Sequence, residues 1–400
     1  MFVAPPGTGK TTGMPPALAG RPHGPDRRMV VVVPRRMAAR AAARMAAMSG
    51  ETVGQTFGYS VRDDRRVGRR TVVEMVTPGL LLRRVQSDPA LEGISTVLLD
   101  EFHERSLDQD LLLALLVELR GAIRQDLGLV VMSATLDVAP VRSLLGALTD
   151  DGGEVPLIEV SSPVHPIDTH WRPGSAHDRI SDRVRDVVLE AMGDQEGDVL
   201  AFLPGRGEIS ATARGLRDRL GRTGSGRGAR GAAAEVIELH GTSPAAVQEM
   251  VLEPRAAGPR RIVLATAVAE TSITVPGVRV VVDSGLSRFQ SFDPGTGLPA
   301  LRTGSVSLST AEQRRGRAGR EAPGHCYRLW ARRDEELMRA HDPPEITRAD
   351  LAGLLLATSV WGASSPSELK WLDPPPKAAV DAARVLLAEL GALDDDGRPT

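Results

Sequence analysis

Short apolar runs, separated by polar and glycine-rich stretches, recur along most of the chain. They are rich in Val, Ile and Leu and lack polar alternation, which is typical of parallel strands covered on both faces. The runs lie at residues 29–33, 72–76, 97–99, 129–132, 199–203, 236–239, 262–264 and 278–282. Helical periodicity at 37–48 and 108–124 falls between them, at the spacing of βαβ units. The pattern predicts an α/β fold.

Two segments interrupt this rhythm. Residues 161–166, rich in Ser and Pro, follow the first set of strands and predict a hinge, whereas the Gly/Arg-rich residues 221–231 predict a flexible loop inside the second set. After Trp330 the strand pattern ends. Residues 349–360 and 377–390 then predict amphipathic helices, the second ended by Gly391.

Composition places the chain among globular proteins. It has 400 residues, of which 42% are hydrophobic and 25% charged, and this length predicts two or three domains. The longest apolar run, residues 111–117, is far shorter than the roughly 18 residues of a membrane span. The N-terminus has no secretory pattern, so we expect a cytoplasmic protein, and the single Cys326 permits no internal disulfide.

The charges almost balance. There are 49 basic and 51 acidic residues, a net charge of −2, which gives no global attraction to polyanions. Any contact with nucleic acid must therefore be local. All but three of the basic residues are arginines, which we attribute chiefly to genomic base composition.

Residues 4–11, APPGTGKT, fit the phosphate-binding loop with alanine in the first glycine position. In such a loop backbone N–H groups bind phosphate oxygens, the lysine adds positive charge and the threonine hydroxyl binds Mg²⁺. An incidental glycine-rich turn is the alternative. The predicted nucleotide contacts are Gly7, Thr8, Gly9, Lys10, Thr11 and Thr12.

The strand predicted at 97–99 ends in two carboxylates, Asp100 and Glu101. We expect Asp100 to hold Mg²⁺ together with Thr11, and Glu101 to orient or deprotonate the attacking water. On its own such a pair could be a solvated strand end. Combined with the phosphate-binding loop, it predicts hydrolysis of nucleoside triphosphates.

An arginine-rich segment, QRRGRAGR, occupies residues 313–320. Arg317 and Arg320 are three residues apart and would share one face of a helix, from which both could reach a γ-phosphate as arginine fingers. A solvated arginine cluster is the alternative.

The ordered motifs resemble those of DEAH-type superfamily 2 helicases, most closely the bacterial HrpB-type ATP-dependent helicases. Residues 100–103, DEFH, resemble motif II, and the segment WLDPPP at 371–376 is similar to the HrpB type. The other helicase motifs also have counterparts in this chain. The matching segments are residues 34–39 for motif Ia, 77–81 for motif Ib, 133–135 for motif III, 202–205 for motif IV, 265–272 for motif V and 313–320 for motif VI. The resemblance implies two tandem RecA-like P-loop NTPase domains, residues 1–162 and 163–335, followed by a partial winged-helix region, residues 336–400.

The resemblance also implies individual roles. His103 would couple the nucleotide site to Ser133 and Thr135. Arg62 would stack on the base with Leu286 on its other face, and because stacking discriminates little between bases we expect ATP and other triphosphates to be accepted with Mg²⁺. The implied catalytic residues are Glu101, Gln313, Arg317, Arg320 and His103. The implied nucleic-acid contacts are Arg35, Arg36, Thr77, Thr266 and Thr271, which would bind the backbone without reading sequence.

The implied partner is single-stranded nucleic acid, with RNA and 3′ to 5′ movement coming from the resemblance alone. We expect a monomer that binds no membrane and leave an accessory protein open. Residues 283–309 resemble a strand-separating β-hairpin, or form a plain structural one. Three departures stand out: a very short first strand, Ala267 where relatives usually carry asparagine, and an end at Thr400 inside the winged helix. A non-unwinding nucleotide- and RNA-binding module and a DNA helicase remain alternatives.

Overall fold

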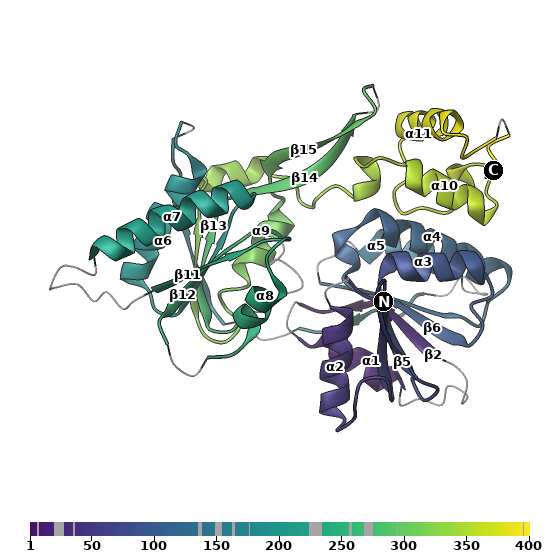
Figure 1. Cartoon of the computed structure of the whole chain (residues 1–400), viewed down its shortest axis with the longest axis horizontal. Helices are drawn as coiled ribbons and strands as arrows, with labels where there is room; N and C mark the ends of the chain where they lie inside the picture. The colour runs from purple at the N-terminus through teal and green to yellow at the C-terminus, as the bar shows by residue number, and fades with distance from the viewer. Residues whose placement is uncertain are drawn as a thin grey trace. The chain divides into compact units, whose positions relative to one another are not determined.

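The computed structural model describes two compact units (Figure 1). The first comprises Met1–Ser162, Gln290–Ala300 and Pro343–Thr400, and the second comprises Pro163–Phe289 and Leu301–Asp342. The structure describes all residues except 6–7, 20–27, 35–36, 135–137, 149–153, 162–164, 176, 224–233, 256–257, 268–274, 294 and 395. Most of the loop predicted at 221–231 and part of the hinge predicted at 161–166 therefore lie outside the described residues.

The first unit is built on an eight-stranded sheet with the order β4-β3-β5-β2-β6-β7-β1-β8. Neighbouring strands pair in parallel, except that β3 and β4 pair antiparallel. The parallel strands predicted in this half are confirmed. The strands are β1 (Phe2–Val3), β2 (Arg28–Val32), β3 (Phe57–Val61), β4 (Asp64–Arg66), β5 (Val73–Val76), β6 (Ile94–Leu99), β7 (Gly128–Ser133) and β8 (Ile158–Glu159).

Helices cover both faces of this sheet, as uninterrupted apolar strands require. Along β2 the buried side chains alternate between the two sides: Val30 and Val32 join the cluster that contains α3, α4 and α5, while Met29 and Val31 join the cluster that contains α1 and α2. The helices are α1 (Lys10–Ala19), α2 (Ala38–Met48), α3 (Pro78–Ser87), α4 (Leu107–Ala122) and α5 (Val138–Gly146).

The C-terminal helices α10 (Ala352–Trp361) and α11 (Lys377–Glu389) also belong to the first unit. Their buried leucines share one apolar cluster with α4. The Trp361 indole N–H donates to Glu118 Oε2 at 2.9 Å, and Gly391 has a φ of +65°, a left-handed conformation that glycine adopts readily at a helix end. Both helices are confirmed, whereas the winged-helix assignment stays a prediction.

The second unit contains a six-stranded parallel sheet with the order β11-β12-β10-β13-β16-β9. Its strands are β9 (Ile167–Trp171), β10 (Asp198–Phe202), β11 (Ala234–Leu239), β12 (Arg260–Ala265), β13 (Val278–Asp283) and β16 (Gly324–Arg328). Its helices are α6 (Ile180–Asp194), α7 (Arg206–Thr223), α8 (Ala245–Leu252) and α9 (Leu308–Arg315). The two halves of the chain thus share an α/β architecture, as predicted.

A separate two-stranded sheet is formed by β14 (Leu286–Asp293) and β15 (Leu298–Ser305). The hairpin predicted within 283–309 is therefore present, and its strand-separating role stays a prediction. Among the described helices, none combines the length and apolarity that crossing a membrane requires.

Candidate active site

The carboxyl edge of the first sheet gathers the predicted chemistry. β1 leads into the loop at 4–11, β6 ends just before Asp100, and β7 ends just before Ala134. In parallel sheets ligands bind beyond this edge. Within the loop Gly9 has a φ of +80°, which only glycine adopts without a steric penalty, and Lys10 begins α1.

Two hydrogen bonds join the loop to the carboxylate pair. Lys10 Nζ donates to Glu101 Oε2 at 2.7 Å, and Thr11 Oγ1 donates to Asp100 Oδ2 at 2.5 Å. All four side chains are buried. Residues about 90 positions apart in the sequence are thus in direct contact at one sheet edge.

Asp100 presents oxygen ligands of the kind that Mg²⁺ prefers. Its Oδ1 accepts the N–H of Glu101 at 2.8 Å, and its Oδ2 lies beside the Thr11 hydroxyl. Burial, and then the negative charge of Glu101, raise the pKa of the Asp100 carboxyl, while the nearby ammonium group opposes them. Bound cationic charge would favour the ionised carboxylate, so this donor pair fits the metal ion that the motifs imply.

Glu101 has a φ of +51°, which is costly for a residue with a Cβ and is found at functional sites held by their surroundings. The short 3₁₀ turn Phe102–Glu104 follows it. There His103 Nδ1 accepts the N–H of Ala134 at 3.3 Å and lies 3.5 Å from Glu101 Oε2. A ring nitrogen that accepts carries no proton, so the contact with Glu101 is not a hydrogen bond. His103 therefore contacts both the carboxylate and the segment after β7.

The remaining predicted residues of the first unit are more dispersed. Thr8 and Thr12 donate their hydroxyls to backbone carbonyls of the loop, at 2.9 and 3.5 Å. Thr77 follows β5 at the same sheet edge and is the N-cap of α3. Arg62 follows β3, five strand positions from β1, or about 24 Å at ~4.8 Å per strand. Its contact with the base stays a prediction. Gly7, Arg35, Arg36, Thr135 and Thr271 lie outside the described residues.

In the second unit Gln313 lies in the last turn of α9, but Arg317 and Arg320 follow the helix, which ends at Arg315. Backbone hydrogen bonds from Arg317 N to Arg314 O and from Ala318 N to Arg315 O, both at 3.0 Å, close tight turns there. The two arginines therefore do not share a helix face. Thr266 follows β12 at the carboxyl edge of the second sheet, and Leu286 begins β14.

Sequence reasoning missed three residues that hold these motifs in place. Gln109 on α4 donates its amide to Asp100 O at 2.8 Å. Arg314 forms a buried ion pair with Asp283 at 2.7 Å and lies over the Phe202 ring. The sequence pattern alone does not distinguish Arg314, which has a structural role, from the predicted arginine fingers Arg317 and Arg320 in the same segment.

The third missed residue, Arg105, lies just beyond the DEFH tetrad and connects it to the C-terminal region. Its guanidinium donates to Asp110 Oδ1 and to Asp373 Oδ2, each at 2.7 Å. Its backbone carbonyl accepts the N–H of Glu345, whose carboxylate in turn accepts the N–H of Leu107 at 2.8 Å. The signal was present in the WLDPPP segment, but the sequence alone could not pair it with Arg105.

Two family models match the chain. Residues 1–144 match the model described as DEAD/DEAH box helicase, and residues 182–322 match the helicase conserved C-terminal domain. Together they cover both α/β halves, which are thereby shown to be tandem helicase domains.

Curated relatives extend the match over nearly the whole chain. The ATP-dependent RNA helicase HrpB of Escherichia coli is 40% identical over 397 residues, covering 99% of this chain and 47% of the relative. The probable ATP-dependent RNA helicase DHX35 homolog of Caenorhabditis elegans is 33% identical over 405 residues, covering 100% of this chain and 54% of the relative. The chain thus spans about half the length of these relatives.

Solved structures agree with this match. A crystal structure of the E. coli DExH-box NTPase HrpB has a TM-score of 0.86 at 38% identity and covers 100% of this chain and 47% of its own. A second, of the E. coli DEAH/RHA helicase HrpB, has a TM-score of 0.88 at 39% identity, with coverages of 100% and 49%. The fold match therefore extends over both units.

Proposed function

Because the chain belongs to the DEAD/DEAH box helicase family, we propose that it hydrolyses nucleoside triphosphates to move along single-stranded RNA and separate duplexes. The observation that carries the proposal is the double contact between the phosphate-binding loop and the carboxylate pair, Lys10 with Glu101 and Thr11 with Asp100. This arrangement brings a cation, a metal-binding hydroxyl and two carboxylates to one sheet edge, as phosphoryl transfer requires.

Each side chain has a distinct task in the proposed reaction. The Lys10 ammonium binds the β and γ phosphates, and the loop N–H groups bind the remaining phosphate oxygens. Thr11 and Asp100 hold Mg²⁺, which when bound neutralises charge on the phosphate oxygens. Glu101 orients the attacking water and accepts its proton.

Residues around the carboxylates position them. Gln109 fixes the backbone of Asp100, and His103 lies between Glu101 and the segment after β7. From the second unit, we assign Arg317 and Arg320 as arginine fingers and Gln313 to positioning of the water. Such fingers are worth about 10³ to 10⁵ in rate.

RNA is favoured over DNA because both curated relatives carry RNA helicase in their names. Backbone contacts from Thr77 and Thr266 would bind the strand without reading its sequence. We propose a cytoplasmic monomer that moves in the 3′ to 5′ direction and accepts several nucleoside triphosphates.

The first test is Glu101→Gln. The amide keeps the shape of the side chain but cannot accept a proton from water, so we expect nucleotide binding to be retained and turnover to fall about 10² to 10⁴-fold. Binding is measured with a fluorescent nucleotide and turnover by phosphate release. Glu92→Gln, at an exposed position away from the loop, is the matched control and should behave as the parent. Near-normal hydrolysis by Glu101→Gln would remove Glu101 from its assigned role.

Polymer dependence separates the proposed function from its alternatives. Hydrolysis is measured without polymer, with single-stranded RNA and with single-stranded DNA. Stimulation by RNA supports the proposal, and stimulation by DNA alone would make the chain a DNA helicase. If neither polymer changes the rate, the motor assignment fails in favour of a non-unwinding module.

A further inference from the structure

Several arginines lie along the outer edge of the first sheet, where β4 is the edge strand. Residues 62–70, RDDRRVGRR, comprise the turn before the edge strand β4, the strand itself and the turn after it, and every arginine among them is exposed. We name Arg65, Arg66, Arg69 and Arg70 the arginine patch. The whole chain carries a net charge of −2, so this concentration of positive charge is local and the rest of the chain is net negative.

No carboxylate forms a direct ion pair with the patch among the described residues, and the two acidic residues of the segment are Asp63 and Asp64. Among the described residues, no ion pair or hydrogen bond joins its four guanidinium groups to an acidic side chain. Asp64, which lies beside the patch, instead accepts a hydrogen bond from the Tyr59 hydroxyl. Four exposed cations thus remain available to an external anion.

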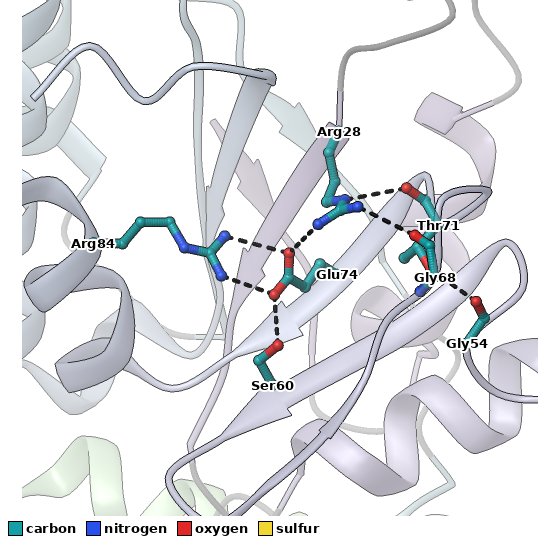
Figure 2. Close-up of polar contacts among 7 residues, drawn as sticks. All are labelled: Arg28, Gly54, Ser60, Gly68, Thr71, Glu74 and Arg84. Carbon is teal, nitrogen blue, oxygen red and sulfur yellow. Dashed lines mark hydrogen bonds and ion pairs between the residues drawn. The ribbon is translucent and has the colours of Figure 1, made fainter. Parts of the chain in front are cut away.

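The loop that carries Arg69 and Arg70 is held from both ends by hydrogen bonds (Figure 2). Gly68 N–H donates to Thr71 Oγ1 at 2.9 Å, and the same hydroxyl donates to Gly54 O at 2.9 Å. Arg28 donates from Nη2 to Gly68 O at 3.3 Å and from Nε to Thr71 O at 3.2 Å. The turn is therefore closed by contacts at the two residues that flank its arginines.

Arg28 is itself fixed by a buried carboxylate. Glu74 on β5 accepts from Arg28 at 3.0 Å, from Arg84 on α3 at 2.9 Å and from the Ser60 hydroxyl at 2.6 Å (Figure 2). Its side chain is fully buried. The network therefore runs from the core of the sheet to the arginine-bearing turn.

Close backbone approach adds to this rigidity. A Cβ on Gly58 would lie 2.5 Å from Arg66 O, and one on Gly68 would lie 2.8 Å from Gly54 O. Both are well below the contact distance of real Cβ atoms, so only glycine permits the hairpin and turn to pack this tightly. Because the arginines stand on a pre-ordered support, binding costs less conformational entropy than on a free loop.

We propose that the arginine patch is an additional binding surface for the phosphodiester backbone of nucleic acid, separate from the contacts that the helicase motifs predict. It rests on the proposed function, which supplies the polyanion. Exposed, unpaired cations bind phosphates by releasing counterions, and this needs no base recognition. The surface would hold a flanking part of the RNA while the motifs act on the single strand.

Two other roles are outcomes of the test. Charged residues on an edge strand also prevent edge-to-edge pairing with other sheets, which would require no ligand. An acidic protein could equally be attracted to four cations. Only nucleic-acid binding predicts that the salt dependence of RNA affinity changes with the patch.

The experiment replaces all four patch arginines by glutamine, R65Q/R66Q/R69Q/R70Q. A matched control, R214Q/R333Q/R339Q/R384Q, removes the same charge at exposed positions elsewhere. Binding of the full chain to an RNA hairpin with a single-stranded tail is measured over a series of salt concentrations. The slope of log K against log salt is negative, and each lost phosphate contact should make it shallower by about 0.7 to 0.9.

We expect the slope of the patch variant to be shallower by about 3 units and its affinity at low salt to be at least tenfold weaker, while hydrolysis without polymer stays at the parental rate. The control should keep most of both. If the patch variant matches the control, the proposal is overturned, and any aggregation seen only in the patch variant then assigns the arginines to edge protection. If the patch variant binds RNA as the control does but no longer binds polyglutamate, the nucleic-acid proposal is overturned and the patch is instead a surface for an acidic protein. A parent that neither binds RNA nor is stimulated by it overturns the proposed function as well.

Discussion

Two buried carboxylates of the first unit show how the surroundings of a single residue decide its charge. Burial, and then the neighbouring Glu101, raise the pKa of Asp100. Burial would also raise the pKa of Glu74, but hydrogen bonds from its neighbouring guanidinium groups and from Ser60 lower it to about 2. Glu74 is therefore firmly ionised at neutral pH, whereas the charge of Asp100 depends on cations near it.

The lowered pKa of Glu74 makes a prediction about acid stability. Its usual value is 4.5, so the folded state binds its proton less readily than the unfolded state. The resulting stabilisation is fully present above pH ~5 and is lost as the pH falls toward 2. It amounts to about 3 kcal/mol at neutral pH, of which about 1 kcal/mol is already lost at pH 4.

The variant Glu74→Gln should remove this pH dependence. We expect its free energy of unfolding to be about 2 kcal/mol lower at pH 7, because two partly exposed arginines lose their charge partner, and the difference from the parent to narrow at pH 4. Urea unfolding followed by circular dichroism at both pH values measures it. The exposed Glu389→Gln is the control. If the difference in free energy of unfolding between the parent and Glu74→Gln is the same at pH 7 and pH 4, the pKa of Glu74 is not lowered in the folded state.

At the scale of elements, β2, β5, β6 and β7 of the first sheet and β10, β11, β12 and β13 of the second followed from the uninterrupted apolar runs, because both faces of each sheet are covered. Strands β3, β8, β9 and β16 did not, because polar residues interrupt their short sequences. The short antiparallel β4 did not, since its residues are all exposed and carry no apolar signal. Arg317 and Arg320 were expected on a helix face, yet the helix ends before them. Residues 316–319, Gly-Arg-Ala-Gly, favour turns over helix because glycine has a low helix propensity. The prediction from the motif did not take this local preference into account.

The candidate site was only partly predictable from the sequence. The loop and the carboxylate pair could be paired because each follows a strand of one parallel sheet. The supporting contacts of Gln109 and Arg105 could not, because long-range hydrogen bonds leave no spacing in the sequence. The structure thus adds the residues that position the chemistry.

The hairpin of β3 and β4 offers a test of packing at this scale. In Gly58→Ala the new methyl group would lie 2.5 Å from Arg66 O, and since that atom is backbone the hairpin has to shift. We expect a loss of about 1 to 3 kcal/mol in the free energy of unfolding. Gly121→Ala on α4, where a Cβ meets nothing within 4 Å, is the matched control and should be neutral or slightly stabilising. Equal melting temperatures of the two variants would contradict the close approach.

At the scale of the whole molecule, the first unit is discontinuous in sequence. Residues from Pro343 onward pack with the sheet formed by residues 1–162. Leu354 and Leu387 share an apolar cluster with α4, and Gln86 donates to Ala357 O at 3.2 Å. The bond from Arg105 to Asp373 places one of these contacts five residues from Asp100 in the sequence.

Asp373→Asn should loosen the C-terminal helices. The ion pair with Arg105 is partly exposed, with 44% of the Asp373 side chain accessible, so its loss should cost about 1 kcal/mol. Hydrogen exchange of the amides in α11 should then be about fivefold faster. Asp381→Asn, which removes only an exposed pair within that helix, should change exchange less. Identical exchange in the two variants would argue that the ion pair does not secure the C-terminal helices.

The interleaved order of the first unit limits how the gene can be divided. A recombinant fragment stopping near residue 162 would leave the leucines of α4 without the cover they share with α10 and α11, and Arg105 without one of its two carboxylate partners. This fragment would expose a contiguous apolar surface and would therefore self-associate. A soluble version of this half is better obtained by joining residue 162 to residue 343 through a flexible tether, so that the sheet and its C-terminal cover are expressed as one polypeptide.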